Sequence, residues 1–299
     1  DGGQAGMTST DRTSRDSYYG RPILKEPVWK PEVGLYLFTG GLAGASASLS
    51  LAARLTGNRS LARTSSLVAA AAVNVSPLLL VKDLGRPERF LNMLRVFKPT
   101  SPMSVGSWLL AVSGAAQSAA ATCELLDVLP AVRDGAQACS GLLGPPLATY
   151  TAALLSDTAV PVWHEARREL PAVFAASSCA SAGAAATLIG NDRATGPARR
   201  LALLGAGVEL IATDIMERRL GLLGEPYRQG GAGRYARAAK TATAFGLGVT
   251  ALGRGRLRRA GAALILGGAA LQRFAIFEAG KASARDPRYT VAVQKQHVG

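Results

Sequence analysis

The sequence contains few of the residues that hold metals and haem. Its 299 residues include three cysteines and two histidines. Cys123, Cys139 and Cys179 stand far apart and form no CxxC pair, so the chain alone supplies no ligand set for an iron–sulfur cluster or a zinc ion. A membrane haem held by two histidines is also excluded, because His297 lies in the C-terminal tail and leaves His164 without a partner.

Charged residues are also scarce, and they are unevenly distributed. They make up 18% of the chain, below the roughly one quarter usual in soluble domains. Stretches of 18 to 25 residues carry no charge at 33–53, 64–81, 99–123, 135–156 and 170–191. A bilayer core needs about 20 mostly apolar helical residues. The sequence therefore predicts a membrane protein that crosses the bilayer several times.

Eight transmembrane helices are expected in all. Five follow the uncharged stretches, and three weaker segments complete the set: 33–54, 64–82, 103–123, 136–156, 170–190, 201–220, 238–253 and 260–277. Short connections between them predict an antiparallel helical bundle. The fold class is an all-α integral membrane protein with a tail at 1–32, a transmembrane domain at 33–280 and a tail at 281–299.

The net charge of +14 and the pI of about 10.3 fit the same picture. Lysine and arginine lie in the loops between the expected spans, which is typical of membrane proteins and argues against nucleic-acid binding. With eight spans, the side that carries both termini has roughly twice the positive charge of the other. We therefore expect cytoplasmic termini.

The loop after the second expected span is the most distinctive stretch. Phe90, Leu91, Leu94 and Phe97 recur at helical spacing, which predicts a short amphipathic helix along the membrane surface. The whole run KDLGRPERFLNMLRVFKPTSPMSVGSW, residues 82–108, resembles the signature of the NrfD/PsrC family. Weaker similarities recur at 36–44, 150–163 and 277–291, and the resemblance extends over roughly residues 18–295.

This resemblance implies an NrfD/PsrC-like bundle of eight transmembrane helices without a metal centre of its own. Such a subunit exchanges electrons between a menaquinone-type quinone in the bilayer and a ferredoxin-like four-cluster iron–sulfur subunit docked on it. A molybdopterin subunit with molybdenum or tungsten carries the substrate chemistry, as in formate dehydrogenase and polysulfide or tetrathionate reductases. The implied location is the cytoplasmic membrane of a bacterium during anaerobic respiration, with the 1–32 tail docking a partner.

Two residues are the main candidates for quinone binding. Tyr150 stands where the resemblance puts a quinone-contacting tyrosine, and its hydroxyl is suited to bond a carbonyl oxygen; otherwise it makes a packing contact. Asp83 is suited to take a proton from the quinol or to organise the loop. Its alternative role is a surface ion pair with Lys82 or Arg86, which contributes little to stability.

Further residues at the starts of the first and third spans complete the predicted quinone site. The family's contacts at the start of the first span are not matched, because this chain has Pro31, Glu32 and Val33 there. Tyr36 or Glu32 is expected to take their place. Ser104, Ser107 and Trp108 open the third span and are expected to line the same slot, although an interface position explains Trp108 equally well.

The 82–108 loop also supplies candidate docking residues. Arg86, Glu88, Arg89, Asn92 and Lys98 are expected to order the loop or to bind a partner subunit and lipid phosphates.

Ionisable residues in or beside the spans leave a second function open. Intramembrane charge is costly and suggests function. Glu209, Asp214, Arg273, Glu278 and His164 form either a proton path or, for Glu209 and Arg273, a buried ion pair for assembly. The alternatives to the quinone-linked anchor are therefore a proton-conducting or transporter-like module and a purely structural anchor.

Overall fold

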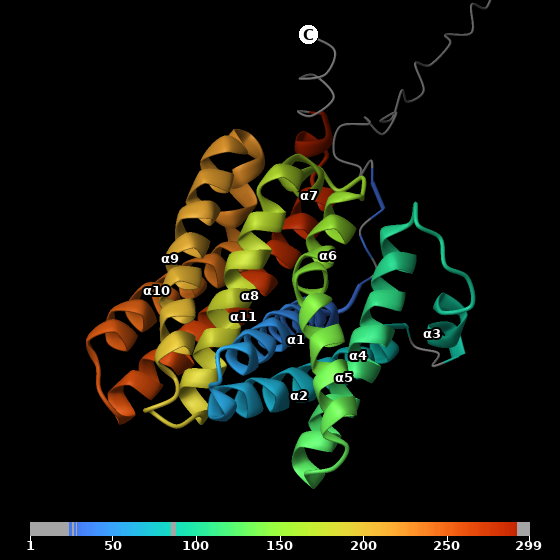
Figure 1. Ribbon diagram of the computed structural model, residues 1–299. Coiled ribbons are helices and arrows are strands. Elements are labelled where there is room, and N and C mark those ends of the chain that lie inside the picture. Colours follow the sequence, from blue (N-terminus) through green and yellow to red (C-terminus); the bar gives the residue numbers. More distant parts are fainter. Residues whose placement is uncertain (1–23, 26, 28, 85–87, 292–299) are drawn as a thin grey trace, which may run out of the picture.

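The structure is a computed structural model that describes residues 24–84, except 26 and 28, and residues 88–291 (Figure 1). Throughout this part of the chain the regular structure is helical, which confirms the all-α fold class. The helices are α1 (Pro31–Leu55), α2 (Arg59–Leu84), α3 (Glu88–Met93), α4 (Pro102–Leu126), α5 (Pro130–Leu142), α6 (Gly144–Ser156), α7 (Pro161–Glu165), α8 (Leu170–Ile189), α9 (Gly196–Arg219), α10 (Gly230–Leu252) and α11 (Arg256–Arg285), with 3-10 turns at Ala166–Arg168 and Gly221–Tyr227.

Five of these helices are long and apolar enough to cross a membrane, namely α1, α2, α4, α8 and α11. The chain is therefore a multi-pass helical membrane protein, as predicted. The other three expected spans fall on α5 with α6, on α9 and on α10. Their passage through the bilayer, and with it the count of eight, stays a prediction.

The fourth expected span is broken in two. α5 ends and α6 begins around Leu143, where Pro145 and Pro146 follow without backbone N–H groups. At this break α6 approaches α1 closely, because a Cβ on Gly44 would meet the backbone of Gly144 and would lie 2.8 Å from the nitrogen of Ala148. The single helix expected over 136–156 is therefore replaced by two helices, α5 and α6, and both pack against α1.

The long helices form two groups. α1, α2, α4, α5 and α6 pack together as an N-terminal bundle, and α8 to α11 pack together as a C-terminal bundle. α1 contacts α8 and α11, and α6 contacts α8, so the two bundles share one interface. Figure 1 shows α8 to α11 on one side of the molecule, α4 to α6 on the other, and α3 at the outer edge beside α4.

Aromatic rings join the bundles at the end where α1 begins and α11 finishes, which we call the terminus side. Trp163 of α7 is fully buried and donates its indole N–H to the carbonyl of Ile276 at 2.8 Å. Its ring stacks on Trp29 at 5.6 Å and on Phe277 at 6.4 Å between centroids. This three-ring stack fixes the segment before α1 to α7 and α11.

Close helix contacts in the C-terminal bundle depend on glycine, and this can be tested on α9. A Cβ on Gly205 would collide with the α8 backbone, 2.8 Å from the carbonyl oxygen of Ala176, whereas one on Gly207 would meet its nearest atom at 4.0 Å. Gly205→Ala should destabilise the protein by about 1–3 kcal/mol and lower its melting temperature in detergent, whereas Gly207→Ala should not. Equal melting temperatures for the two variants would show that α8 and α9 do not pack this closely.

Candidate functional site

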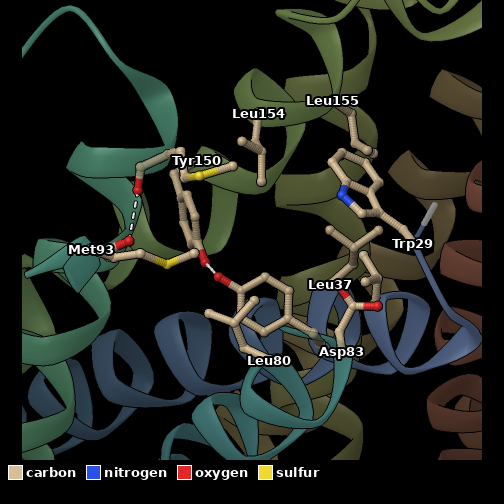
Figure 2. Close-up of a pocket in the computed structure, with 12 residues that line it drawn as sticks. Trp29, Leu37, Leu80, Asp83, Met93, Tyr150, Leu154 and Leu155 are labelled. Atoms are coloured by element: carbon tan, nitrogen blue, oxygen red, sulfur yellow. Dashed lines mark hydrogen bonds between the residues drawn. The ribbon is translucent and has the colours of Figure 1, made fainter. Parts of the chain in front are cut away.

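A cavity of about 80 Å³ opens on the terminus side of the N-terminal bundle, between α1, α2, α4 and α6 (Figure 2). Its walls are mainly apolar, with polar groups contributed by two tyrosines, a serine and a carboxylate. The lining residues are Trp29, Val33, Tyr36, Leu37, Leu80, Asp83, Met93, Met103, Ser107, Tyr150, Leu154 and Leu155. We refer to this cavity as the tyrosine pocket.

The two tyrosines meet inside the pocket. The hydroxyl of Tyr36 on α1 and that of Tyr150 on α6 are hydrogen-bonded, with either oxygen able to donate. The Tyr150 ring lies against α4 at Gly106, where an added Cβ would come within 2.6 Å of the ring. Tyr36 is buried and Tyr150 is half-buried. The arrangement places two phenol hydroxyls in a mainly apolar wall, where either one can form a hydrogen bond with an oxygen atom of a ligand.

Asp83 lies at the edge of the same pocket, near the end of α2. Its Oδ1 accepts a hydrogen bond from the backbone N–H of Lys30 at 2.9 Å. Lys30 precedes α1 and offers no side-chain cap of its own, so Asp83 caps the first turn of α1 from a neighbouring helix. Beside it, Lys82 pairs with Glu32 at 2.8 Å. Glu32, the alternative to Tyr36, thus faces Lys82 and does not line the tyrosine pocket.

Ser104 and Trp108 lie outside this pocket. The hydroxyl of Ser104 donates to the carbonyl of Val96 and accepts from the N–H of Lys98, both at 3.0 Å, so it fastens the loop to α4. Trp108 packs edge-on against Phe97 with 6.4 Å between centroids. One turn of helix separates Ser104 from Ser107, and it is Ser107 that faces the pocket.

Trp29 is a pocket residue that the sequence did not single out. It closes one side of the cavity and stacks on Trp163. A tryptophan just before the first span is ambiguous in sequence, because interface anchors occupy the same position. Its role depends on a contact with α7, more than 130 residues away in the chain, which no local pattern could reveal.

The proposed docking residues are only partly within the described structure. Arg86 and the side chain of Arg89 lie outside it. Glu88, Asn92 and Lys98 are exposed on α3 and the loop that follows it, at the edge of the N-terminal bundle. These positions are available to a partner.

Glu209 and Arg273 lie close together in the C-terminal bundle, 2% and 1% exposed. The Arg273 guanidinium lies over the Phe174 ring at 3.6 Å and donates to the Phe174 carbonyl at 2.9 Å and to the Ser178 hydroxyl at 3.1 Å. The Glu209 oxygens have no hydrogen-bond partner in the described part of the chain. Glu209 and Arg273 are therefore buried neighbours of opposite formal charge without a direct hydrogen bond between them.

The other ionisable residues expected there are separate from this pair. Asp214 is half-exposed and pairs with Arg218 one turn later at 2.8 Å. His164 is exposed in α7 on the terminus side. Glu278 is partly buried on α11. The five residues therefore do not form one cluster.

The terminus side also carries an interaction outside the spans. The hydroxyl of Tyr289 donates to Oε2 of Glu225 at 3.2 Å, and Arg288 pairs with the same carboxylate at 3.6 Å. Partial burial, followed by the contact with Glu225, raises the pKa of Tyr289. The phenol therefore stays protonated and holds the segment after α11 against the turn that follows α9.

Comparison with known families supports the resemblance seen in the sequence. The structure is that of a multi-pass helical membrane protein. Its terminus-side pocket is mainly apolar and contains a few buried polar groups. Residues 24–119 match the family described as Polysulphide reductase, NrfD. The match spans α1 to most of α4, including Tyr36 and Asp83, and confirms the predicted similarity to NrfD. No curated protein gives a significant match to the chain.

Within residues 24–84 and 88–291, apart from 26 and 28, no group of three or more His, Cys, Asp and Glu side chains could hold a metal ion.

The structural role of Asp83 can be separated from its charge. Asp83→Ala removes the acceptor for the Lys30 N–H and should lower the free energy of unfolding by about 1 kcal/mol. Asp83→Asn keeps an oxygen at that position and should unfold close to the original temperature in detergent. If the melting temperatures of both variants fall equally, the negative charge of Asp83, and not its hydrogen bond with the Lys30 N–H, holds α1 to α2.

Proposed function

We propose that this chain is the membrane anchor and quinone-reactive subunit of a multi-subunit oxidoreductase. In this role it exchanges electrons between the membrane menaquinone pool and an iron–sulfur partner subunit. The observation that carries the proposal is the tyrosine pocket, in which Tyr36, Tyr150 and Asp83 face an apolar slot. The NrfD match covers every lining residue of the pocket except Tyr150, Leu154 and Leu155 of α6.

The pocket has the chemistry that a quinone head group needs. A quinone is a flat, largely apolar ring with two oxygen atoms, and when bound it supplies two-electron, two-proton redox chemistry. Leu37, Leu80 and Leu154 offer apolar walls, and the tyrosine hydroxyls offer hydrogen bonds at one end. Apolar lining with a few fixed polar groups is the usual composition of small-molecule sites.

Each polar group has a distinct part in this proposal. Tyr36 and Tyr150 bond each other, so the hydroxyl that accepts in this pair keeps its own proton free to donate to a ligand oxygen. The burial of Tyr36 keeps bulk water away from that oxygen. Asp83 is half-buried at the pocket edge, and its Oδ1 accepts from the backbone N–H of Lys30. We assign to its other oxygen the role of taking or giving a proton.

The partners in this proposal dock on the terminus side. The pocket opens there, and the exposed α3 region with Glu88, Asn92 and Lys98 lies beside it. A short distance between quinone and iron–sulfur cluster favours electron transfer, so both should meet this end of the molecule. We propose a ferredoxin-like four-cluster subunit and a molybdopterin subunit, of the formate dehydrogenase or polysulfide or tetrathionate reductase type. We also propose a location in the cytoplasmic membrane of a bacterium, and the positive loop charge favours cytoplasmic termini.

The alternative function, a proton-conducting or transporter-like module, is based on the buried side chains of Glu209 and Arg273. Arg273 is held by a ring, a carbonyl and a hydroxyl at once, which fixes it in place. Groups that relay protons or bind transported ions must change their partners. The contacts of Arg273 thus favour a role in assembly, and the quinone-linked function remains our proposal.

Quinone binding can be measured on the purified chain. Because Trp29 lines the pocket, a menaquinone analogue should quench tryptophan fluorescence. Tyr150→Phe removes one hydrogen bond of about 1.4 kcal/mol and should weaken binding about tenfold. Tyr235→Phe, whose ring stacks on Phe274 in the C-terminal bundle, is the matched control and should bind normally. Equal affinity in all three proteins would rule out the tyrosine pocket as the binding site.

The partners can be identified by mild extraction of the membrane complex. We expect a stoichiometric iron–sulfur subunit and a large subunit with molybdenum or tungsten, detected by mass spectrometry and metal analysis. Recovery of the chain without iron or either metal, under conditions that keep other membrane complexes intact, would favour the transporter-like alternative.

A further inference from the structure

A second hollow, separate from the tyrosine pocket, lies where the two bundles meet. It is a groove of about 550 Å³ between α1, α6, α8 and α9, and it shares no lining residue with the tyrosine pocket. Most of its lining residues are alanine, leucine or proline. Ala52 and Leu204, which line it, are exposed, so the groove opens on the outer surface of the molecule. We refer to it as the interbundle groove.

The groove lies within one half of the bilayer. Its lining residues on α1 extend from Ala45 to Ala52, which is about 10 Å at 1.5 Å per residue. Half of a bilayer core is about 15 Å thick. Since α1 begins on the terminus side and ends at Leu55, Ala52 lies near the opposite membrane surface. The groove therefore runs from that surface towards the middle of the membrane.

The break in the fourth expected span contributes to this groove. Pro145, in the first turn of α6, and Thr149, one turn later, both line it. The hydroxyl of Thr149 donates to the Pro145 carbonyl at 2.9 Å, and that of Ser48 on α1 donates to the Gly141 carbonyl at 2.9 Å. Both hydroxyl protons are thus used by the backbone. The walls of the groove are suited to an apolar occupant.

One charged side chain stands at the edge of these apolar walls. Among the described residues that line the groove, Arg200 of α9 alone is charged. It is exposed, and within the described part of the chain its guanidinium makes no ion pair or hydrogen bond. Asp192, the acidic residue nearest to it along the chain, pairs with Arg259 at 3.7 Å instead. The guanidinium is therefore available to an anion from outside the chain.

The start of α9 adds to the positive potential at this end of the groove. Pro197, in the first turn of α9, also lines the groove. This turn contains no acidic residue, and no side chain caps it. The N-terminus of a helix carries a partial positive charge and favours a nearby anion. Arg200 and the helix end thus act in the same direction.

We propose that the interbundle groove binds an anionic phospholipid from the leaflet opposite the terminus side. An acyl chain lies along the apolar walls, and the phosphate accepts hydrogen bonds from the Arg200 guanidinium, which matches phosphate oxygens in geometry and charge. An uncharged occupant would fill the walls but leave Arg200 without a counter-charge. The bound lipid contacts α1 and α6 of one bundle and α8 and α9 of the other, and so joins them. This lipid site does not depend on the proposed quinone function.

The preference for an anionic head group can be measured on the purified full chain. Delipidated protein is titrated with phosphatidylglycerol or with phosphatidylcholine of identical acyl chains, and bound lipids are counted by native mass spectrometry. The first phosphatidylglycerol should bind about tenfold more tightly than the first phosphatidylcholine. Arg200→Gln should abolish this difference. Arg199→Gln, which removes the neighbouring arginine that does not line the groove, is the matched control and should keep it.

The place of the acyl chain needs a different substitution. Cys179 lines the groove on α8 and is half-buried. Cys179→Phe fills the groove and should weaken the binding of both lipids by about tenfold, because the chains are identical. Ala172→Phe adds a ring at an exposed position of the same helix outside the groove and should bind both lipids normally. Thr149→Phe gives a second reading if Cys179→Phe does not fold.

Several outcomes would overturn the lipid site. Equal affinity of the unaltered chain for the two lipids would do so, as would equal losses in Arg199→Gln and Arg200→Gln, which indicate diffuse attraction to basic residues. Normal lipid binding by both Cys179→Phe and Thr149→Phe would place the acyl chain elsewhere. Displacement of phosphatidylglycerol by inorganic phosphate would show a free-anion site, and displacement by the menaquinone analogue would show a quinone site.

Discussion

Close approach of helices at small residues is the constraint on which this structure depends. Within a bilayer no hydrophobic force drives helices together, and association relies on packing and interhelical hydrogen bonds. α1 meets α6 where Gly44 faces Gly144 and Ala148. Tyr36 lies about two turns from this crossing on α1, and Tyr150 lies just beyond it on α6. The contact that a larger residue at 44 would abolish therefore brings the two phenols together.

The pocket is also held from the terminus side, where the chain leaves the bundle. Asp83 bonds the backbone just before α1, and the Trp29–Trp163–Phe277 stack connects the same segment to α11. One wall of the pocket is thus built on the C-terminal bundle, although the pocket lies in the N-terminal one. A partner that docked on this surface would contact the pocket and both bundles at once.

Much of the arrangement follows from patterns that can be read in the sequence. Uncharged stretches locate α1, α2, α4 and α8 because burying charge in lipid is costly, and the 82–108 motif directs attention to Asp83. The Gly-Pro-Pro at 144–146 was a visible signal for the break between α5 and α6. Ser104 could not be distinguished from Ser107, because both open α4 and only the packing of neighbouring helices decides which one faces the pocket. Trp29 required the same long-range information.

The two bundles use buried polar groups in different ways. In the C-terminal bundle, Glu209 and Arg273 have opposite formal charge and lie near each other, and Arg273 donates to the Phe174 carbonyl and the Ser178 hydroxyl. These contacts of Arg273 join α11 to α8. In the N-terminal bundle the buried groups are neutral, and Gln117 on α4 bonds Ser66 on α2 and Ser140 on α5. The bundle that contains the tyrosine pocket is therefore joined by neutral hydrogen bonds, whereas the C-terminal bundle uses a buried guanidinium.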